Sequence, residues 1–273
     1  MHALQRFKKH AELGLRWIRC GWRLFLRNPW LLGGMGFCCG ALAVTLGAVP
    51  LFGGPFLGLL SPLALASFYI TIDGISKQKM KLPPALRLAA VRQSPREFMN
   101  VAREERRLMQ VLVMGLYSLV VVVLTDILVW TVAGTALAAP LTSLSAAALF
   151  SVMVATLLKF VIYLLLAASL VFTLPLALLH DQALVPAATD SIRRGLHYGV
   201  ALLAIVALSL VPFFLSAMAS FYSTWLGISI GFLAGAFVLP ISVCSLYCSY
   251  RTMFTVTQSA QSASASLERA DYV

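Results

Sequence analysis

The chain has 273 residues, of which 60% are hydrophobic and only 11% are charged, and its mean hydropathy is +0.88. Soluble domains carry about 25% charged residues, because their surfaces must interact with water. This composition excludes an ordinary water-soluble domain and predicts an integral membrane protein. The net charge of +11 is the feature that would instead suggest binding to nucleic acid.

The positions of the basic residues argue against nucleic acid. Of the 21 Lys and Arg residues, seven lie in residues 6–27 and nine in residues 77–107, and only Lys159 lies inside an apolar run. Basic residues that cluster beside apolar runs are typical of the cytoplasmic segments of membrane proteins. No known nucleic-acid-binding motif accompanies them. We therefore predict no nucleic-acid partner.

Residues 1–29 are predicted to form a basic amphipathic segment on the cytoplasmic side of the membrane. Aromatic rings favour the headgroup region and arginines pair with phosphates, so both can anchor a helix in the membrane surface. The predicted anchor comprises Trp17, Arg19, Trp22, Arg23, Phe25, Arg27 and Trp30. Asn28-Pro29 would then turn the chain into the first span. Because about 28 residues precede the apolar run, we expect no cleaved signal peptide.

Six apolar runs follow, and each reaches the roughly 20 residues that a transmembrane helix needs. They cover residues 30–50, 55–75, 108–134, 146–178, 198–219 and 227–250. The connections near 50–55, 135–145 and 220–226 contain no Lys or Arg, whereas the other connections are basic. The sequence therefore predicts an all-α polytopic membrane helix bundle over residues 30–255, with six spans in three hairpins and both termini in the cytoplasm.

Two more cytoplasmic segments are predicted. Residues 76–107 carry a helix-start signal at residues 94–97 and an apolar stripe after it, which indicate an amphipathic surface helix; a solvated basic linker is the alternative. The lipid bilayer is therefore an expected partner, with anionic lipids as one option, together with an unknown membrane or cytoplasmic protein. Residues 256–273 are rich in Ser and Ala and are predicted to be a disordered tail.

Two ionisable residues are predicted to lie inside spans, Asp126 in the third and Lys159 in the fourth. Charges inside a membrane are costly, so these positions are candidates for function. The two spans follow one another in the chain and should be antiparallel, with both residues in the outer half of the membrane or near its middle. A structural ion pair is the favoured interpretation, while a proton or substrate path and the absence of pairing stay open.

Glycines four residues apart form small faces on two spans. They are Gly36 and Gly40 in the first span and Gly227, Gly231 and Gly235 in the last. Such faces allow two helix backbones to approach closely. Because a six-span bundle needs close packing within itself, we predict internal packing rather than dimerisation.

The residue patterns of known enzymes and metal sites are missing from the sequence. It has no phosphate-binding loop, zinc-protease motif, nucleophile elbow or dinucleotide fingerprint. The five cysteines, which are Cys20, Cys38, Cys39, Cys244 and Cys248, are expected to serve apolar packing rather than a disulfide framework, a metal or redox chemistry. We therefore predict no cofactor, no metal and no catalytic residue, and we do not expect an enzyme.

Three segments carry a family resemblance. They are Trp17-x-x-x-Gly21-x-x-Leu24-Phe25-x-x-x-Pro29, then residues 178–195 with Ser191, Arg194 and Gly195, and finally Ser245-x-Tyr247-x-Ser249-Tyr250-Arg251-x-x-Phe254. Their order and spacing resemble an uncharacterised family of proteobacterial six-span inner-membrane proteins over most of residues 15–255. The resemblance implies a bacterial inner-membrane location and a bundle of helical hairpins. It implies no substrate, reaction or catalytic residue.

Three classes of function remain. A structural, assembly or lipid- and partner-interacting membrane protein is favoured, because the outer connections are short and the spans contain few polar residues. A small transporter or channel that uses Asp126 and Lys159 is the alternative. Pro62, Pro175 and Pro240 could break helices as transporters require, which keeps this alternative open. An intramembrane enzyme is the third and most distant class.

Overall fold

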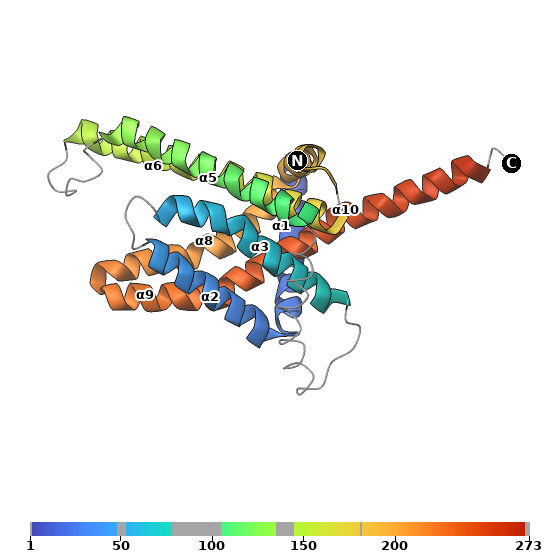
Figure 1. Ribbon diagram of the computed structural model, residues 1–273, viewed down its shortest axis with the longest axis horizontal. Helices are drawn as coiled ribbons and strands as arrows, with labels where there is room; N and C mark the ends of the chain where they lie inside the picture. Colours follow the sequence, from blue (N-terminus) through green and yellow to red (C-terminus); the bar gives the residue numbers. More distant parts are fainter. Residues whose placement is uncertain (1, 48–52, 78–104, 135–144, 181, 271–273) are drawn as a thin grey trace. The chain divides into compact units, whose positions relative to one another are not determined.

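The computed structural model describes residues 2–47, 53–77, 105–134, 145–180 and 182–270, and the regular structure in these ranges is helical (Figure 1). The helices are α1 (His2–Phe25), α2 (Pro29–Gly47), α3 (Gly53–Lys77), α5 (Glu105–Ala133), α6 (Ala146–His180), α7 (Leu184–His197), α8 (Gly199–Tyr222), α9 (Thr224–Leu233), the π-helix η3 (Ala234–Val238) and α10 (Leu239–Ala270). Residues 78–104 of the predicted surface segment 76–107 lie outside the described residues, so its helix stays a prediction.

The predicted polytopic membrane bundle is confirmed. Among the described residues, five helical stretches are long and apolar enough to cross a membrane: Pro29–Leu46, Gly53–Lys77, Leu108–Ala133, Phe150–Leu179 and Trp225–Phe254. A sixth is obtained if α7 and the first half of α8, which meet at 90°, count as one broken span. The last stretch runs without interruption through α9, η3 and α10.

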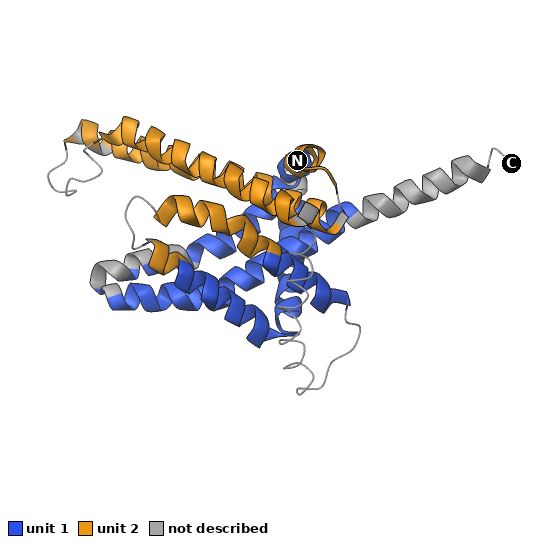
Figure 2. Ribbon diagram, viewed as in Figure 1, with its two compact units in different colours: residues 1–42, 67–100, 193–273 blue, residues 43–66, 101–192 orange. Residues whose placement is uncertain are grey.

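The helices form two compact units (Figure 2). The first unit contains residues 1–42, 67–100 and 193–273, and the second contains residues 43–66 and 101–192. In the first unit, α1 packs along α10 and α8, and α8 packs along α9 as a hairpin. In the second unit, α5 and α6 form a hairpin. The α8–α9 and α5–α6 hairpins confirm two of the three predicted hairpins. The turn of the predicted α2–α3 hairpin, at residues 48–52, lies outside the described residues.

Helix α1 ends where the sequence changes from an amphipathic to an apolar pattern. Asn28 lies between α1 and α2, and its side-chain oxygen accepts a hydrogen bond of 3.4 Å from the Leu31 backbone N–H. Pro29 takes the first position of α2, where its missing N–H and fixed φ cost nothing. Asn28 and Pro29 therefore begin the first span at the residue that the sequence indicates.

The predicted disordered tail at residues 256–273 is wrong for most of its length, because α10 continues to Ala270. The reason is that a helix already formed by packing extends without a new nucleation step. Ala, Gln, Leu, Glu and Arg, which make up much of this segment, are also good helix formers.

Candidate functional site

The predicted membrane anchor in α1 divides into two sets of residues. Arg19, Arg23 and Arg27 are exposed, and so are Trp22 and Trp30 in the neighbouring turns. Arg19, Trp22 and Arg23 lie on α1, Arg27 follows its last residue and Trp30 lies in α2, and all five are exposed to lipid or a partner.

Two residues of that anchor were assigned wrongly. Trp17 and Phe25 are each only 3% exposed, so they belong to the protein core and not to a surface that faces headgroups. The Trp17 ring meets Tyr198 edge-on at 6.1 Å, and the Phe25 ring meets Phe237 at 6.4 Å. An apolar stripe looks the same in sequence whether it faces lipid or another helix, which is why these residues were misplaced.

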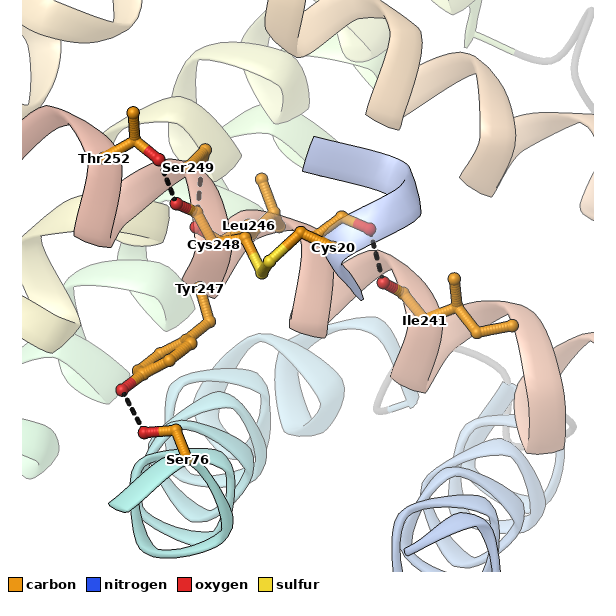
Figure 3. The surroundings of a disulfide bond; sticks show 9 residues. Cys20, Ser76, Ile241, Leu246, Tyr247, Cys248, Ser249 and Thr252 are labelled. Atoms are coloured by element: carbon orange, nitrogen blue, oxygen red, sulfur yellow. Dashed lines mark hydrogen bonds between the residues drawn. A yellow bond between two sulfur atoms is a disulfide. The ribbon is translucent and has the colours of Figure 1, made fainter. Parts of the chain in front are cut away.

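A disulfide joins α1 to α10 and corrects the expectation that none would form. Cys20 and Cys248 are 228 residues apart in sequence, and their Cα atoms lie 6.3 Å apart (Figure 3). Beside them, Gly21 packs so closely on Ser245 that a Cβ atom there would lie 2.6 Å from the Ser245 backbone nitrogen. Sequence spacing could not show this pairing, because it depends on α1 lying along α10.

A polar cluster next to the disulfide was missed by the sequence analysis. The Tyr247 hydroxyl donates a hydrogen bond of 2.7 Å to Asp73 Oδ1. It also lies 3.0 Å from Ser76 Oγ (Figure 3). Lys77 Nζ lies 2.6 Å from Asp73 Oδ2, and the Asp73 side chain is only 16% exposed. This cluster ties α3 to α10. Asp73 stands inside the apolar run 55–75, which is the signal that could have identified it.

Within the first unit, residues from the three segments that carry the family resemblance contact one another. The Arg194 guanidinium donates to the Met253 backbone carbonyl and stacks on the Phe254 ring at 4.2 Å from its centroid. The first segment joins them through the contact between Gly21 and Ser245. Residues spread over the chain therefore converge on the part of α10 that follows Ile241.

Asp126 and Lys159 form an ion pair between α5 and α6. Lys159 Nζ lies 2.8 Å from Asp126 Oδ1, and the two side chains are 40% and 39% exposed. Lys159 also lies 5.5 Å from the centre of the Tyr163 ring. Each residue is about five residues, or roughly 8 Å, from the midpoint of its span. The two charges therefore share one depth in an antiparallel pair and neutralise each other.

The two glycine faces pack inside the protein. A Cβ atom on Gly36 would collide with the Gly235 carbonyl and the Pro240 ring, and one on Gly235 would lie 3.1 Å from Gly40 Cα. Gly36 and Gly40 thus bring α2 onto η3. The other two glycines serve the α8–α9 hairpin, because Ser216 donates a 2.6 Å hydrogen bond to the Gly227 carbonyl and a Cβ on Gly231 would lie 3.1 Å from Ser216 Oγ.

Comparisons of this chain with family models, with curated proteins and with solved structures find no match. The family resemblance of the three segments therefore stays a prediction. Within the described ranges, no group of three or more His, Cys, Asp or Glu residues could hold a metal ion. The polar features on which a function can be built are thus the exposed arginines of α1, the Asp73 cluster and the Asp126–Lys159 pair.

Proposed function

We propose that the protein has a structural or assembly role in the bacterial inner membrane, in which a basic cytoplasmic face binds lipid or a protein partner. The observation that carries this proposal is the arrangement of α1. Its apolar stripe is buried against α8 and α10, while Arg16, Arg19, Arg23 and Arg27 are exposed. Within the part of the chain that the structure describes, none of the four has a carboxylate within ion-pair distance.

The chemistry of this surface suits an anionic partner. Arginine keeps its charge at any physiological pH and binds phosphate or carboxylate oxygens through two N–H groups at once. Because the bundle already holds α1 in place, binding does not have to order the helix, so less free energy is lost on association. The four arginines are therefore a preformed basic face.

The distribution of charge supports a cytoplasmic location for this face. Twenty of the 21 Lys and Arg residues belong to the N-terminus, the 76–107 segment, the 180–197 segment and the C-terminus, and the opposite connections have none. Cytoplasmic segments of membrane proteins carry this excess. The proposal of cytoplasmic termini rests on this pattern, and the proposal of the bacterial inner membrane rests on the family resemblance.

The pair Cys20 and Cys248 offers a test of the orientation. The cytoplasm keeps thiols reduced, so rapid treatment of intact cells with a membrane-permeant maleimide should find both residues as thiols. The same protein purified in air should contain the disulfide. Replacing Cys38, Cys39 and Cys244 by Ala leaves these two as the labelled positions. A disulfide already present when the cells are trapped would contradict a cytoplasmic α1.

Co-purification from native membranes tests the function itself. The wild-type protein should retain a characteristic lipid or protein, and the combined replacement of Arg16, Arg19, Arg23 and Arg27 by Gln should remove it. A control with Lys8→Gln changes charge on the same helix and should keep the bound partner. Identical bound molecules in all three preparations would overturn the proposal.

Transport is the second candidate, and the exposure of the Asp126–Lys159 pair favours it. Charges that lie within spans and remain about 40% exposed require contact with water, lipid or another molecule. Purified protein in liposomes with a pH gradient should leak no faster than empty liposomes if the role is structural. A proton flux that Asp126→Asn abolishes would instead establish transport.

A further inference from the structure

The surface of the first unit has a cavity of about 320 Å³ between three helices. Its lining consists of Ile18, Arg19, Trp22 and Arg23 from α1, Leu208 from α8 and Ile241 from α10. Two arginines and one tryptophan thus meet three aliphatic side chains at one place. The wall of the cavity is almost entirely apolar, so the two arginines line it with their aliphatic stems. This arrangement suits a ligand that has an apolar part inside the cavity and a charged part outside it.

The depth of the cavity can be measured from the turn between α8 and α9 at Ser223. Leu208 lies 14 residues from Tyr222, and Ile241 lies 17 residues from Thr224, which correspond to roughly 21 and 26 Å along the helices. The hydrocarbon core of a bilayer is about 30 Å thick. Ile241 and Leu208 therefore lie about 4 and 9 Å inside the hydrocarbon boundary on the side of α1.

That depth places the arginines of the cavity beside the headgroups. Arg19 and Arg23 are four residues apart on α1, so their side chains start from one face of the helix, about 5–6 Å from each other. Neither has a carboxylate partner among the described residues. Trp22, which is 49% exposed, lies between them in sequence and has an indole N–H that suits the polar boundary.

From this geometry we propose that the cavity is a binding site for an anionic phospholipid of the leaflet that α1 faces. Its phosphate lies between Arg19 and Arg23, and one acyl chain passes over Leu208 and Ile241. Arginine binds phosphate through two N–H groups, and the aliphatic wall contributes van der Waals contacts along the acyl chain. A soluble anion or an acidic peptide would use the two charges but leave the aliphatic wall uncovered. The site rests on the proposed function, of which it names the partner.

Native mass spectrometry of the full-length protein in detergent tests the site with phosphatidylglycerol as the probe. Arg19→Gln with Arg23→Gln should weaken binding about 30-fold, since each basic residue near a membrane surface contributes about 1 kcal/mol, which is a factor of about five. The matched control is Arg16→Gln with Arg27→Gln, which removes the same charge from two exposed positions outside the cavity, one on α1 and one just after it. This control should weaken binding by less than about threefold.

A second variant tests the acyl-chain half of the site without touching the arginines. Leu208→Trp fills the cavity and should weaken phosphatidylglycerol binding about tenfold, because the indole ring takes the place of the acyl chain and its packing contacts are lost. Glycerol phosphate, which has the headgroup charge but no chain, should bind at least 100-fold more weakly than the lipid. The thermal transition of each variant, measured in the same detergent, should match that of the wild type.

Three outcomes would overturn the lipid site. They are equal losses for the two arginine pairs, equal binding of phosphatidylcholine and phosphatidylglycerol, and binding of glycerol phosphate as tight as that of the lipid. If Arg19→Gln with Arg23→Gln leaves lipid binding intact but removes a protein that co-purifies, the lipid site is wrong and the proposed function stands. If neither lipid nor protein depends on the four arginines, both are wrong.

Discussion

The two units of the chain are held by contacts of different range. In the first unit, the disulfide joins residues 228 apart, and the Asp73–Tyr247 hydrogen bond joins residues 174 apart. In the second unit, the Asp126–Lys159 pair joins residues only 33 apart in neighbouring helices. The first unit therefore depends on chain segments from both ends of the sequence, and the second contains a hairpin that is local.

The polar groups of the two units also differ in their surroundings. The Asp73 side chain is 16% exposed and has two partners, the Tyr247 hydroxyl and Lys77 Nζ. Asp126 is 39% exposed and has one charged partner. A largely buried charge that accepts a hydrogen bond from a buried side chain holds a structure in one arrangement, whereas a half-exposed pair is available to other molecules. This difference separates a structural cluster from a position that could still interact.

Breaking the disulfide of the first unit should have the largest effect on stability. Reducing Cys20–Cys248 in the purified protein should lower the free energy of unfolding by about 3 kcal/mol, because the bond closes a long loop. Hydrogen exchange should increase in α1 and not in α5 and α6. The variant Cys20→Ser should start at the lower stability and show no response to reductant. Equal responses of wild type and variant would contradict a role for the disulfide.

A glycine contact in the first unit should give the next largest effect. Gly36→Leu places a side chain against Gly235 and Pro240 and should cost about 2–3 kcal/mol, measured as a lowered thermal transition in detergent. Gly34→Leu is the matched control in the same helix, since a Cβ there meets nothing within 4 Å. If Gly34→Leu destabilises the protein as much, the close contact of Gly36 with Gly235 and Pro240 is not responsible for the loss.

Tyr247→Phe removes one hydroxyl from the Asp73 cluster. A hydrogen bond to a charged group contributes about 1.5–3 kcal/mol, so the variant should lose about 2 kcal/mol of unfolding free energy. Tyr117→Phe, at an exposed position of α5, is the control and should have little effect. An unchanged transition in Tyr247→Phe would show that Lys77 alone satisfies Asp73.

The smallest effect is expected for the ion pair of the second unit. A double-mutant cycle with Asp126→Asn and Lys159→Gln should give a coupling energy of about 0.6 kcal/mol, the average for polar contacts between membrane helices. The pair is half-exposed, which keeps the coupling small. A coupling of several kcal/mol would show that the pair is as enclosed as the Asp73 cluster.

Several features of the fold could be predicted because they are local properties of the chain. Apolar run length predicts a membrane-crossing helix wherever it reaches about 20 residues, and the described spans follow those runs. The pairing of α5 with α6 follows from the short connection between them. Pairing of Asp126 with Lys159 was foreseeable for the same reason, since an antiparallel hairpin fixes which residues share a depth.

Other features could not be predicted because they depend on which helix meets which. From the sequence alone, the apolar stripe that contains Trp17 and Phe25 could face either lipid or another helix. The packing of α1 on α8 and α10 buries it within the protein. The cavity beside Arg19 and Arg23 has the same origin, since Leu208 and Ile241 come from two other helices.

The sequence by itself determined the class of this protein, its helical content, the positions of its spans and the charge on the side of α1. These follow from hydrophobicity and charge, which each segment carries wherever it lies. Only the tertiary structure decided that Cys20 meets Cys248, that Asp73 meets Tyr247 and that Gly36 and Gly40 meet Gly235. Such contacts depend on the close approach in space of helices that are distant in sequence. The spacing of residues along the chain does not show which of these helices lie side by side.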